Sequence, residues 1–246
     1  FLLELYDDYA NERLTKEDFV QIVRLTESYV FRRNVCNIPT NSLNKTFAKF
    51  TVGLNKEKYL ESVKASYQLL PSYRRFPSDE EFLREIKVRD LYNFRSRGYW
   101  LRKMENHGKK ETVYTGEYTI EHIMPQNENL SIEWKKDLGQ NWKEIHETYL
   151  HTLGNLTLTG YNSEYSDHSF HDKQTHEKGF IHSPLTLNEG LGKVTTWNKE
   201  AIEERADRLA KLAVDVWPSP DLPEEKLSDY REAPKQQTSY TLEDYT

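Results

Sequence analysis

The sequence predicts a mainly α-helical protein that carries a small β-hairpin near its middle. Three observations support this fold class: helical spacing of apolar residues over most of residues 1–111, β-prone runs near residues 112–120 and 156–159, and a long amphipathic segment over residues 198–217. The chain has 246 residues, of which 36% are hydrophobic, and its 16 Tyr, 10 Phe and 5 Trp supply bulky core material. A chain of this length can bury a substantial core.

Capping residues and apolar spacing define the helices expected in the first half of the chain. A capping box that begins at Thr15 predicts a helix ending near Arg33 or Asn34. A second box, which begins at Ser78, predicts a helix that continues to about Val88. Further helices are expected over residues 42–50, 56–69 and 91–105.

The pattern changes after residue 111. Residues 112–114 and 118–120 have the composition of short strands, and a third β-prone run covers Leu156 to Thr159. Prolines after Trp217 end the last amphipathic segment. Helices are expected over residues 134–149, 167–179 and 198–217.

These patterns divide the chain into four expected regions. They are a helical region over residues 1–111, a core region containing the hairpin over 112–190, a closing helix over 191–218, and a polar linker or tail over 219–246. We expect the helices to pack around the hairpin. Because the sequence begins Phe1-Leu2-Leu3 without a methionine, we also expect it to be part of a longer protein.

The cysteine count and hydropathy exclude several classes of protein. With a single cysteine, Cys36, the chain can form neither an intramolecular disulfide nor a zinc cluster built on paired cysteines. This favours a reducing, cytoplasmic location. No apolar run approaches the roughly 18 residues of a membrane span, and no secretory signal is present.

The net charge of −6 is unevenly distributed along the chain. Residues 1–118 carry 21 Lys and Arg against 17 Asp and Glu, whereas residues 119–190 carry 5 against 11. The stretch from Arg84 to Lys110 has nine Lys and Arg against three Asp and Glu, interleaved with aromatic residues. This stretch predicts a DNA-facing surface, because phosphate contacts supply most non-specific affinity. Its expected contacts are Arg95, Arg97, Arg102 and Lys103.

A second interpretation explains the same basic stretch. Helices in soluble proteins commonly have a charged solvent face opposite an aromatic core stripe. The pattern between residues 84 and 110 fits that description equally well.

Residues with catalytic potential concentrate after this stretch, where seven of the eight histidines fall between His122 and His182. Glu121 and His122 lie where a β-prone run meets a turn marked by proline. A carboxylate beside an imidazole can place a cation and a base at one phosphate. Asn162 offers a neutral oxygen near a helix start. Oxygen ligands suit Mg²⁺ or Mn²⁺, and a neutral histidine suits general-base catalysis near neutral pH.

Four motifs follow one another in this part of the chain: Glu121-His122 with Pro125, Gly-Asn-Leu-Thr-Leu at 154–158, Asn162, and Phe-x-x-Lys at 170–173. Their order resembles the C-terminal HNH nuclease domain of GmrSD-type modification-dependent (type IV) restriction endonucleases. Similarity in the helical segments near residues 25–33 and 202–218 extends the resemblance to roughly residues 1–218.

The resemblance implies a ββα-metal (HNH) core within a helical bundle and a role for each matching residue. Glu121 and Asn162 would bind a single Mg²⁺ or Mn²⁺ ion, and His122 would be the general base. Asn155 would hold the loop between the two strands, and Lys173 would contact phosphate or offset transition-state charge. The implied activity is hydrolysis of DNA phosphodiester bonds in the restriction of phage or modified foreign DNA.

The resemblance also implies an upstream NTP-using or sensing domain in the full-length protein. The hydropathy of the chain predicts no membrane association. Two other functions remain open: a non-catalytic nucleic-acid- or protein-binding module with a decayed HNH hairpin, and an RNA-cleaving enzyme of the same fold. About 30 residues separate His122 from Asn155, so we expect an insertion that splits the hairpin. His168 and His171 compete for a role in the site, whereas His151, His176 and His182 are expected to be surface or structural residues.

Overall fold

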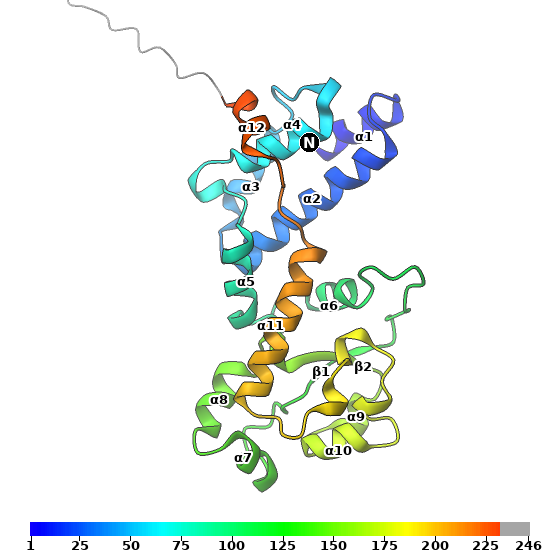
Figure 1. The fold of residues 1–246 in the computed structure, drawn as a ribbon, viewed down its shortest axis with the longest axis vertical. Helices are drawn as coiled ribbons and strands as arrows, with labels where there is room; N and C mark the ends of the chain where they lie inside the picture. The colour runs from blue at the N-terminus through cyan, green and yellow to red at the C-terminus, as the bar shows by residue number, and fades with distance from the viewer. Residues whose placement is uncertain (232–246) are drawn as a thin grey trace, which may run out of the picture. The chain divides into compact units, whose positions relative to one another are not determined.

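The structure, a computed structural model, describes residues 1–231 (Figure 1). These residues fall into two units, each built from discontinuous segments. Unit 1 comprises Phe1–Thr26, Thr40–Phe76 and the described residues from Pro220 onward, and unit 2 comprises Glu27–Pro39 and Pro77–Ser219. One long helix, α2 (Lys16–Val35), contributes residues to both units.

Unit 1 is helical and includes part of the expected tail. Leu222 and Leu227 are buried against Ala65, so this part of the tail contributes to the core of unit 1. The rest of that tail, residues 232–246, lies outside the described residues. The other helices of unit 1 are α1 (Leu2–Ala10), α3 (Leu43–Ala48), α4 (Tyr59–Gln68) and α12 (Glu224–Leu227).

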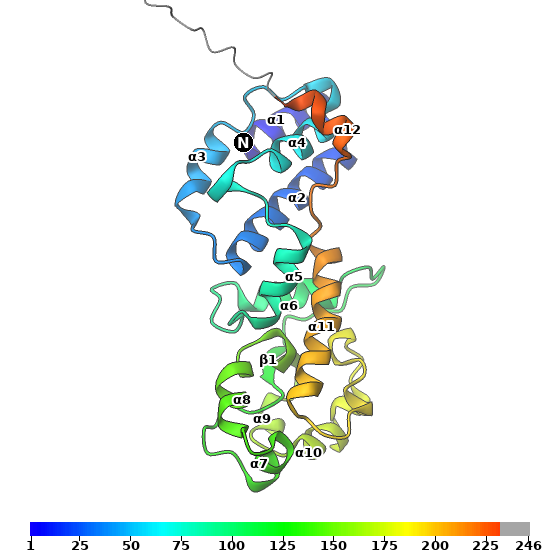
Figure 2. The same ribbon diagram turned by 60° about the vertical axis from the view of Figure 1, so that its left-hand side comes forward.

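Unit 2 contains the strands and the helices that surround them, as Figure 2 shows for α7 to α10 near β1. Its core is formed by two clusters of buried apolar side chains, which include Trp100, Trp134, Trp197 and Trp217. Its elements are α5 (Asp79–Val88), α6 (Arg97–Glu105), β1 (Thr119–His122), α7 (Ile132–Leu138), α8 (Trp142–Tyr149), β2 (Leu156–Thr159), α9 (Asn162–Tyr165), α10 (Phe170–Thr175) and α11 (Lys199–Val216).

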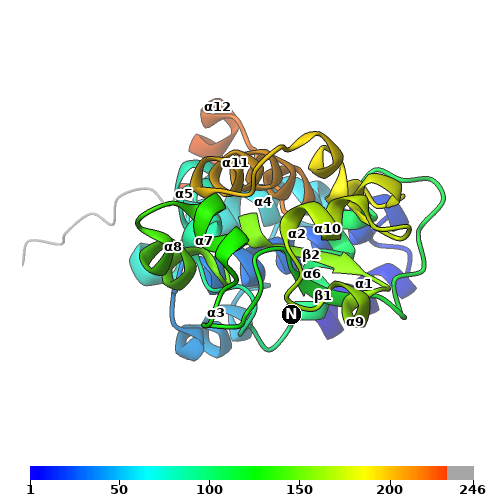
Figure 3. The ribbon, with the colours of Figure 1, turned by 90° about the horizontal axis from the view of Figure 1, so that it is seen from below.

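The strands β1 and β2 form an antiparallel pair, visible side by side in Figure 3. Thr119 pairs with Thr159, and His122 pairs with Leu156. The expected fold class, mainly helical with a small antiparallel sheet, is confirmed. The expected insertion is present as well, because α7 and α8 lie between the two strands.

The strand expected over residues 112–114 is absent, because its backbone has a different partner. The Val113 amide donates to Oδ1 of Asn106 at 2.6 Å, and Nδ2 of Asn106 donates to the Val113 carbonyl at 3.2 Å. One side-chain amide thus takes the place of a neighbouring strand. The strand expected over residues 118–120 instead extends to His122.

Helix caps explain why several helices begin where the sequence predicted. The Ser78 hydroxyl accepts a hydrogen bond from the Glu81 amide at the start of α5. Asn198 caps α11 through the Ala201 amide at 3.0 Å. The helix α11 buries an apolar stripe against the core, as its periodicity predicts.

Two helices are shorter than expected. Helix α6 begins only at Arg97, and in the segment before it the amides of Leu91 and Tyr92 donate to the carbonyl of His151. Helix α10 covers only Phe170–Thr175 of the expected residues 167–179.

Hydropathy gives no sign of a membrane span. Within residues 1–231, none of the helices combines the length and apolar character that crossing a bilayer requires.

Candidate active site at the end of the β1 strand

A fully buried asparagine fixes the turn that follows His122. Oδ1 of Asn155 accepts the Met124 amide at 2.7 Å and the Trp197 indole N–H at 3.2 Å. Nδ2 of Asn155 donates to the carbonyls of Met124 and Leu150, each at 3.0 Å. These four bonds use the full capacity of a carboxamide. Asn155 therefore ties β2 and the end of the insertion to the turn after β1.

A buried arginine supports the same turn from α11. Nη1 of Arg205 donates to the carbonyls of Leu153, Gly154 and Leu156, and Nη2 donates to the carbonyl of Leu187. Burial lowers the pKa of Arg205 to about 9, which leaves the guanidinium charged at neutral pH. Its positive charge is thus solvated by carbonyl dipoles of the segment that carries Asn155.

His122 is the last residue of β1, and only 4% of its surface is exposed. Its Nε2 lies 3.0 Å from Nδ1 of His151, and the Tyr92 ring contacts the imidazole edge-on at 4.5 Å between centroids. Burial, with smaller contributions from His151 and Lys173, lowers the pKa of His122 to about 3. The imidazole is therefore neutral near pH 7 and can accept a proton.

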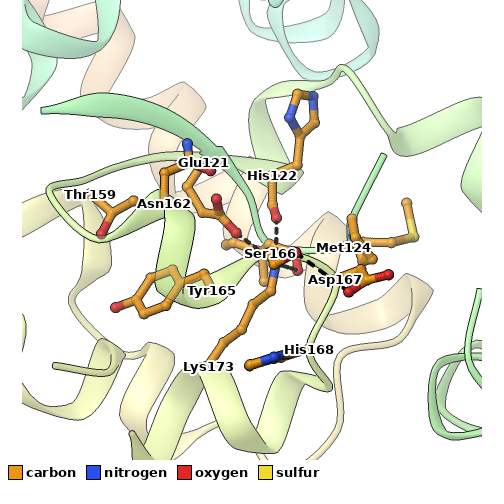
Figure 4. A network of polar contacts seen from close by, with 12 residues as sticks. Glu121, His122, Met124, Thr159, Asn162, Tyr165, Ser166, Asp167, His168 and Lys173 are labelled. Carbon is orange, nitrogen blue, oxygen red and sulfur yellow. Dashed lines mark hydrogen bonds and ion pairs between the residues drawn. The ribbon is translucent and has the colours of Figure 1, made fainter. Parts of the chain in front are cut away.

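Glu121 and His122 are adjacent on a strand, so their side chains point to opposite sides, as Figure 4 shows. Oε1 of Glu121 lies 2.6 Å from Nζ of Lys173. The same Nζ donates to the carbonyls of His122 and Ile123, at 3.0 and 3.2 Å. Burial raises the pKa of Glu121 to about 7 despite the lysine, so this carboxylate would gain stability from further positive charge.

Asn162 is the first residue of α9 and lies beside β1. Its Nδ2 donates to the carbonyl of Ile120 at 2.8 Å and to Oγ1 of Thr119 at 3.2 Å. Both of these bonds use the nitrogen, which leaves the amide oxygen as the atom of Asn162 suited to bind a cation.

A cleft of about 350 Å³ brings these residues together. Glu121, His122 and Asn162 all line it, together with Tyr92 and Asp167. A second cleft of about 410 Å³ shares Tyr92 and Asn162 with the first. Residues from distant parts of the sequence therefore line two clefts in unit 2 that have residues in common.

The residues of the site lie within a region that matches a known protein family. The sequence model of the family described as GmrSD restriction endonucleases, C-terminal domain, matches residues 76–212, which is more than half of the chain. The chain belongs to this family. Membership indicates a nuclease role for the GmrSD C-terminal domain described here, and the match includes every residue of the two clefts. No curated protein and no solved structure matches the chain.

The second cleft of this GmrSD C-terminal domain is basic. Of the four cations expected to face DNA, Arg97 and Arg102 line it, whereas Arg95 is exposed and lies outside both clefts. Lys103 forms an ion pair with Glu27, and its expected contact with DNA stays a prediction.

Lys173 also differs from its expected position in a GmrSD C-terminal domain. Its side chain is 1% exposed, and its ammonium group contacts Glu121 and two backbone carbonyls. Direct contact with a phosphate does not fit this arrangement. Lys173 holds the Glu121 carboxylate and the end of β1, and its other expected role, to offset transition-state charge, stays a prediction.

The histidines outside the β1 strand differ in their relation to the cleft, and His176 and His182 are exposed, as expected. His168 and His171 are exposed and do not line the cleft, which removes the geometric basis for their competition with His122. His151, expected to be a surface or structural residue, lies against His122. The proximity of His151 to Asn155 in the sequence is a signal that could have indicated its place beside His122.

Proposed function

We propose that this domain is an HNH-type endonuclease that hydrolyses DNA phosphodiester bonds with the help of one divalent cation. The observation that carries the proposal is the cleft that His122, Glu121 and Asn162 all line. The proposal includes a restriction role against phage or modified foreign DNA, and an upstream NTP-using or sensing domain in the full-length protein.

The donor set of the cleft fits Mg²⁺ or Mn²⁺. Glu121 and Asn162 would hold the ion through oxygen atoms, and the raised pKa of Glu121 indicates a site that favours added positive charge. Within residues 1–231, no group of three or more His, Cys, Asp and Glu side chains is arranged to hold a metal. Two protein ligands would leave the remaining coordination positions to water and phosphate. A bound cation would supply Lewis-acid stabilisation of charge on the phosphate oxygens.

The other residues of the cleft have separate tasks in this proposal. His122 accepts the proton of the attacking water, and a nearby phosphate would raise its low pKa toward a useful value. Asn155 and Lys173 keep the end of β1 in place. Arg97 and Arg102 bind the sugar–phosphate backbone next to the cut.

Removal of divalent metal should abolish cleavage. We expect protein treated with EDTA to leave supercoiled plasmid uncut, and added Mg²⁺ or Mn²⁺ to restore nicking. The variant Glu121→Gln should need more metal for half-maximal activity, because a neutral amide binds a divalent cation more weakly than a carboxylate. Glu177→Gln, at an exposed position, is the matched control.

Two results would contradict this part of the proposal. One is full activity in EDTA, and the other is an unchanged metal requirement in Glu121→Gln. Parallel assays with structured RNA decide the substrate, since preferential RNA cleavage would favour the ribonuclease alternative over DNA.

Replacement of the arginines that line the basic cleft should weaken DNA binding without changing the sequence preference of the protein. In Arg97→Ala and Arg102→Ala we expect the slope of log affinity against log salt concentration to fall by about one unit for each phosphate that is no longer neutralised. Binding is measured by fluorescence anisotropy in EDTA, so that the duplex stays intact. Lys211→Ala, an exposed lysine on α11, should leave the slope unchanged. Equal slopes in all four proteins would place the DNA elsewhere.

A further inference from the structure

The ring of His151 lies against the imidazole of His122. Nδ1 of His151 lies 3.0 Å from Nε2 of His122, which is hydrogen-bond distance. The Tyr92 ring stacks on His151 with an interplanar angle of 12° and contacts His122 edge-on. The imidazole of His122 is thus contacted by two rings that come from distant parts of the chain.

Backbone bonds hold this pair of rings in place. The carbonyl of His151 accepts the amides of Leu91 and Tyr92, at 2.9 and 3.4 Å, so Tyr92 is joined to the residue on which its ring stacks. Immediately before His151, the carbonyl of Leu150 accepts Nδ2 of Asn155 at 3.0 Å. His151 is therefore positioned by the same asparagine that fixes the turn after His122.

The contact has a chemical consequence for His122. A neutral imidazole carries a proton on one ring nitrogen and a lone pair on the other. If Nε2 of His122 donates to Nδ1 of His151, the lone pair is on Nδ1 of His122, where it can take a proton from water. If the proton were on Nδ1, the lone pair would be directed at His151 and not at a substrate.

We propose that His151 is a positioning residue that holds His122 in the Nε2–H tautomer, with Tyr92 packing both rings. This inference rests on the proposed function, because it names the residue that prepares the general base. In the reaction the proton lost by water goes to Nδ1 of His122. The insertion between the two strands thus supplies, near its end, the residue that orients His122.

Two substitutions separate positioning from packing. Asparagine places a polar atom where His151 has Nδ1, since both atoms lie two bonds from Cβ. Leucine fills the same space with a methyl group and cannot bind Nε2–H. If His151 only fills space, His151→Leu should cleave DNA at least as fast as His151→Asn.

The test uses the full chain, and it combines plasmid-nicking kinetics with long-range ¹H–¹⁵N NMR spectra of the histidine rings. We expect His151→Leu to lower kcat by about 10- to 100-fold with KM nearly unchanged, and His151→Asn to recover most of the loss. The spectra, recorded without metal and assigned through His122→Ala, should show the Nε2–H tautomer in the wild type and in His151→Asn. His151→Leu should show a mixture of tautomers.

Three outcomes would overturn the inference. They are wild-type kcat in His151→Leu, equal losses in both variants, and an Nδ1–H tautomer at His122 in the wild type. The ring spectra do not depend on cleavage. If the wild type fails to cut DNA, the nuclease proposal fails, and the tautomer still decides whether His151 positions His122.

Discussion

His122→Ala should lose metal-dependent DNA cleavage by about 10²- to 10⁴-fold, the range that a general base contributes. The imidazole is neutral at neutral pH because burial lowers its pKa, and it lines the cleft with Glu121 and Asn162. No other imidazole takes the same place, since His151 contacts His122 from the side of Nε2. Plasmid nicking at saturating Mg²⁺, measured as an initial rate, gives the size of the loss.

Controls distinguish loss of chemistry from loss of fold. His182→Ala removes an exposed imidazole and should cut at the wild-type rate. His122→Ala should retain the circular-dichroism spectrum of the wild type and its affinity for DNA in EDTA, because the basic cleft is intact. Wild-type cleavage by His122→Ala would remove His122 from the mechanism, and with it the proposed HNH assignment.

Arg205→Met should destabilise unit 2 by about 3–5 kcal/mol, since it leaves buried carbonyls without a donor. The guanidinium of Arg205 binds four carbonyls, three of them on Leu153, Gly154 and Leu156. Methionine fills much of the same volume but donates no hydrogen bond. Arg205→Lys keeps a charge without the planar fork, so we expect an intermediate loss of stability.

Urea unfolding followed by tryptophan fluorescence measures this loss in the relevant part of the chain. All five tryptophans, at positions 100, 134, 142, 197 and 217, lie in unit 2. Arg208→Met removes an exposed arginine one turn along α11, whose guanidinium donates to the Glu189 carbonyl, and should cost much less. Equal free energies of unfolding for Arg205→Met and Arg208→Met would contradict the supporting role of Arg205.

Local signals in the sequence predicted most elements correctly. Ser78 and Asn198 mark helix starts because a side-chain oxygen can satisfy an amide that has no partner within the helix. The run from Leu156 to Thr159 is β-prone, and it forms β2 over the same residues. Where local signals failed, a distant group had taken the backbone bonds, as Asn106 does at Val113.

Some features of the candidate site were likewise predicted from the sequence, and others were not. Glu121, His122, Asn155 and Asn162 were identified from residue types and motif order, and the structure brings them to one cleft or to the turn beside it. The position of Lys173 under Glu121 and the pairing of Lys103 with Glu27 were not predictable. Both depend on which carboxylate lies near a lysine after the chain has folded.

The sequence by itself determined the class of fold, the identity of the central residues and the family to which they belong, because spacing, caps and motif order are local properties. Only the tertiary structure decided that His151 and Tyr92 contact His122, and that Arg205 supports the turn carrying Asn155. These contacts join residues far apart in sequence. The partners in these contacts are selected by packing and by the need to satisfy buried polar groups. No local sequence pattern encodes packing or the pairing of buried polar groups.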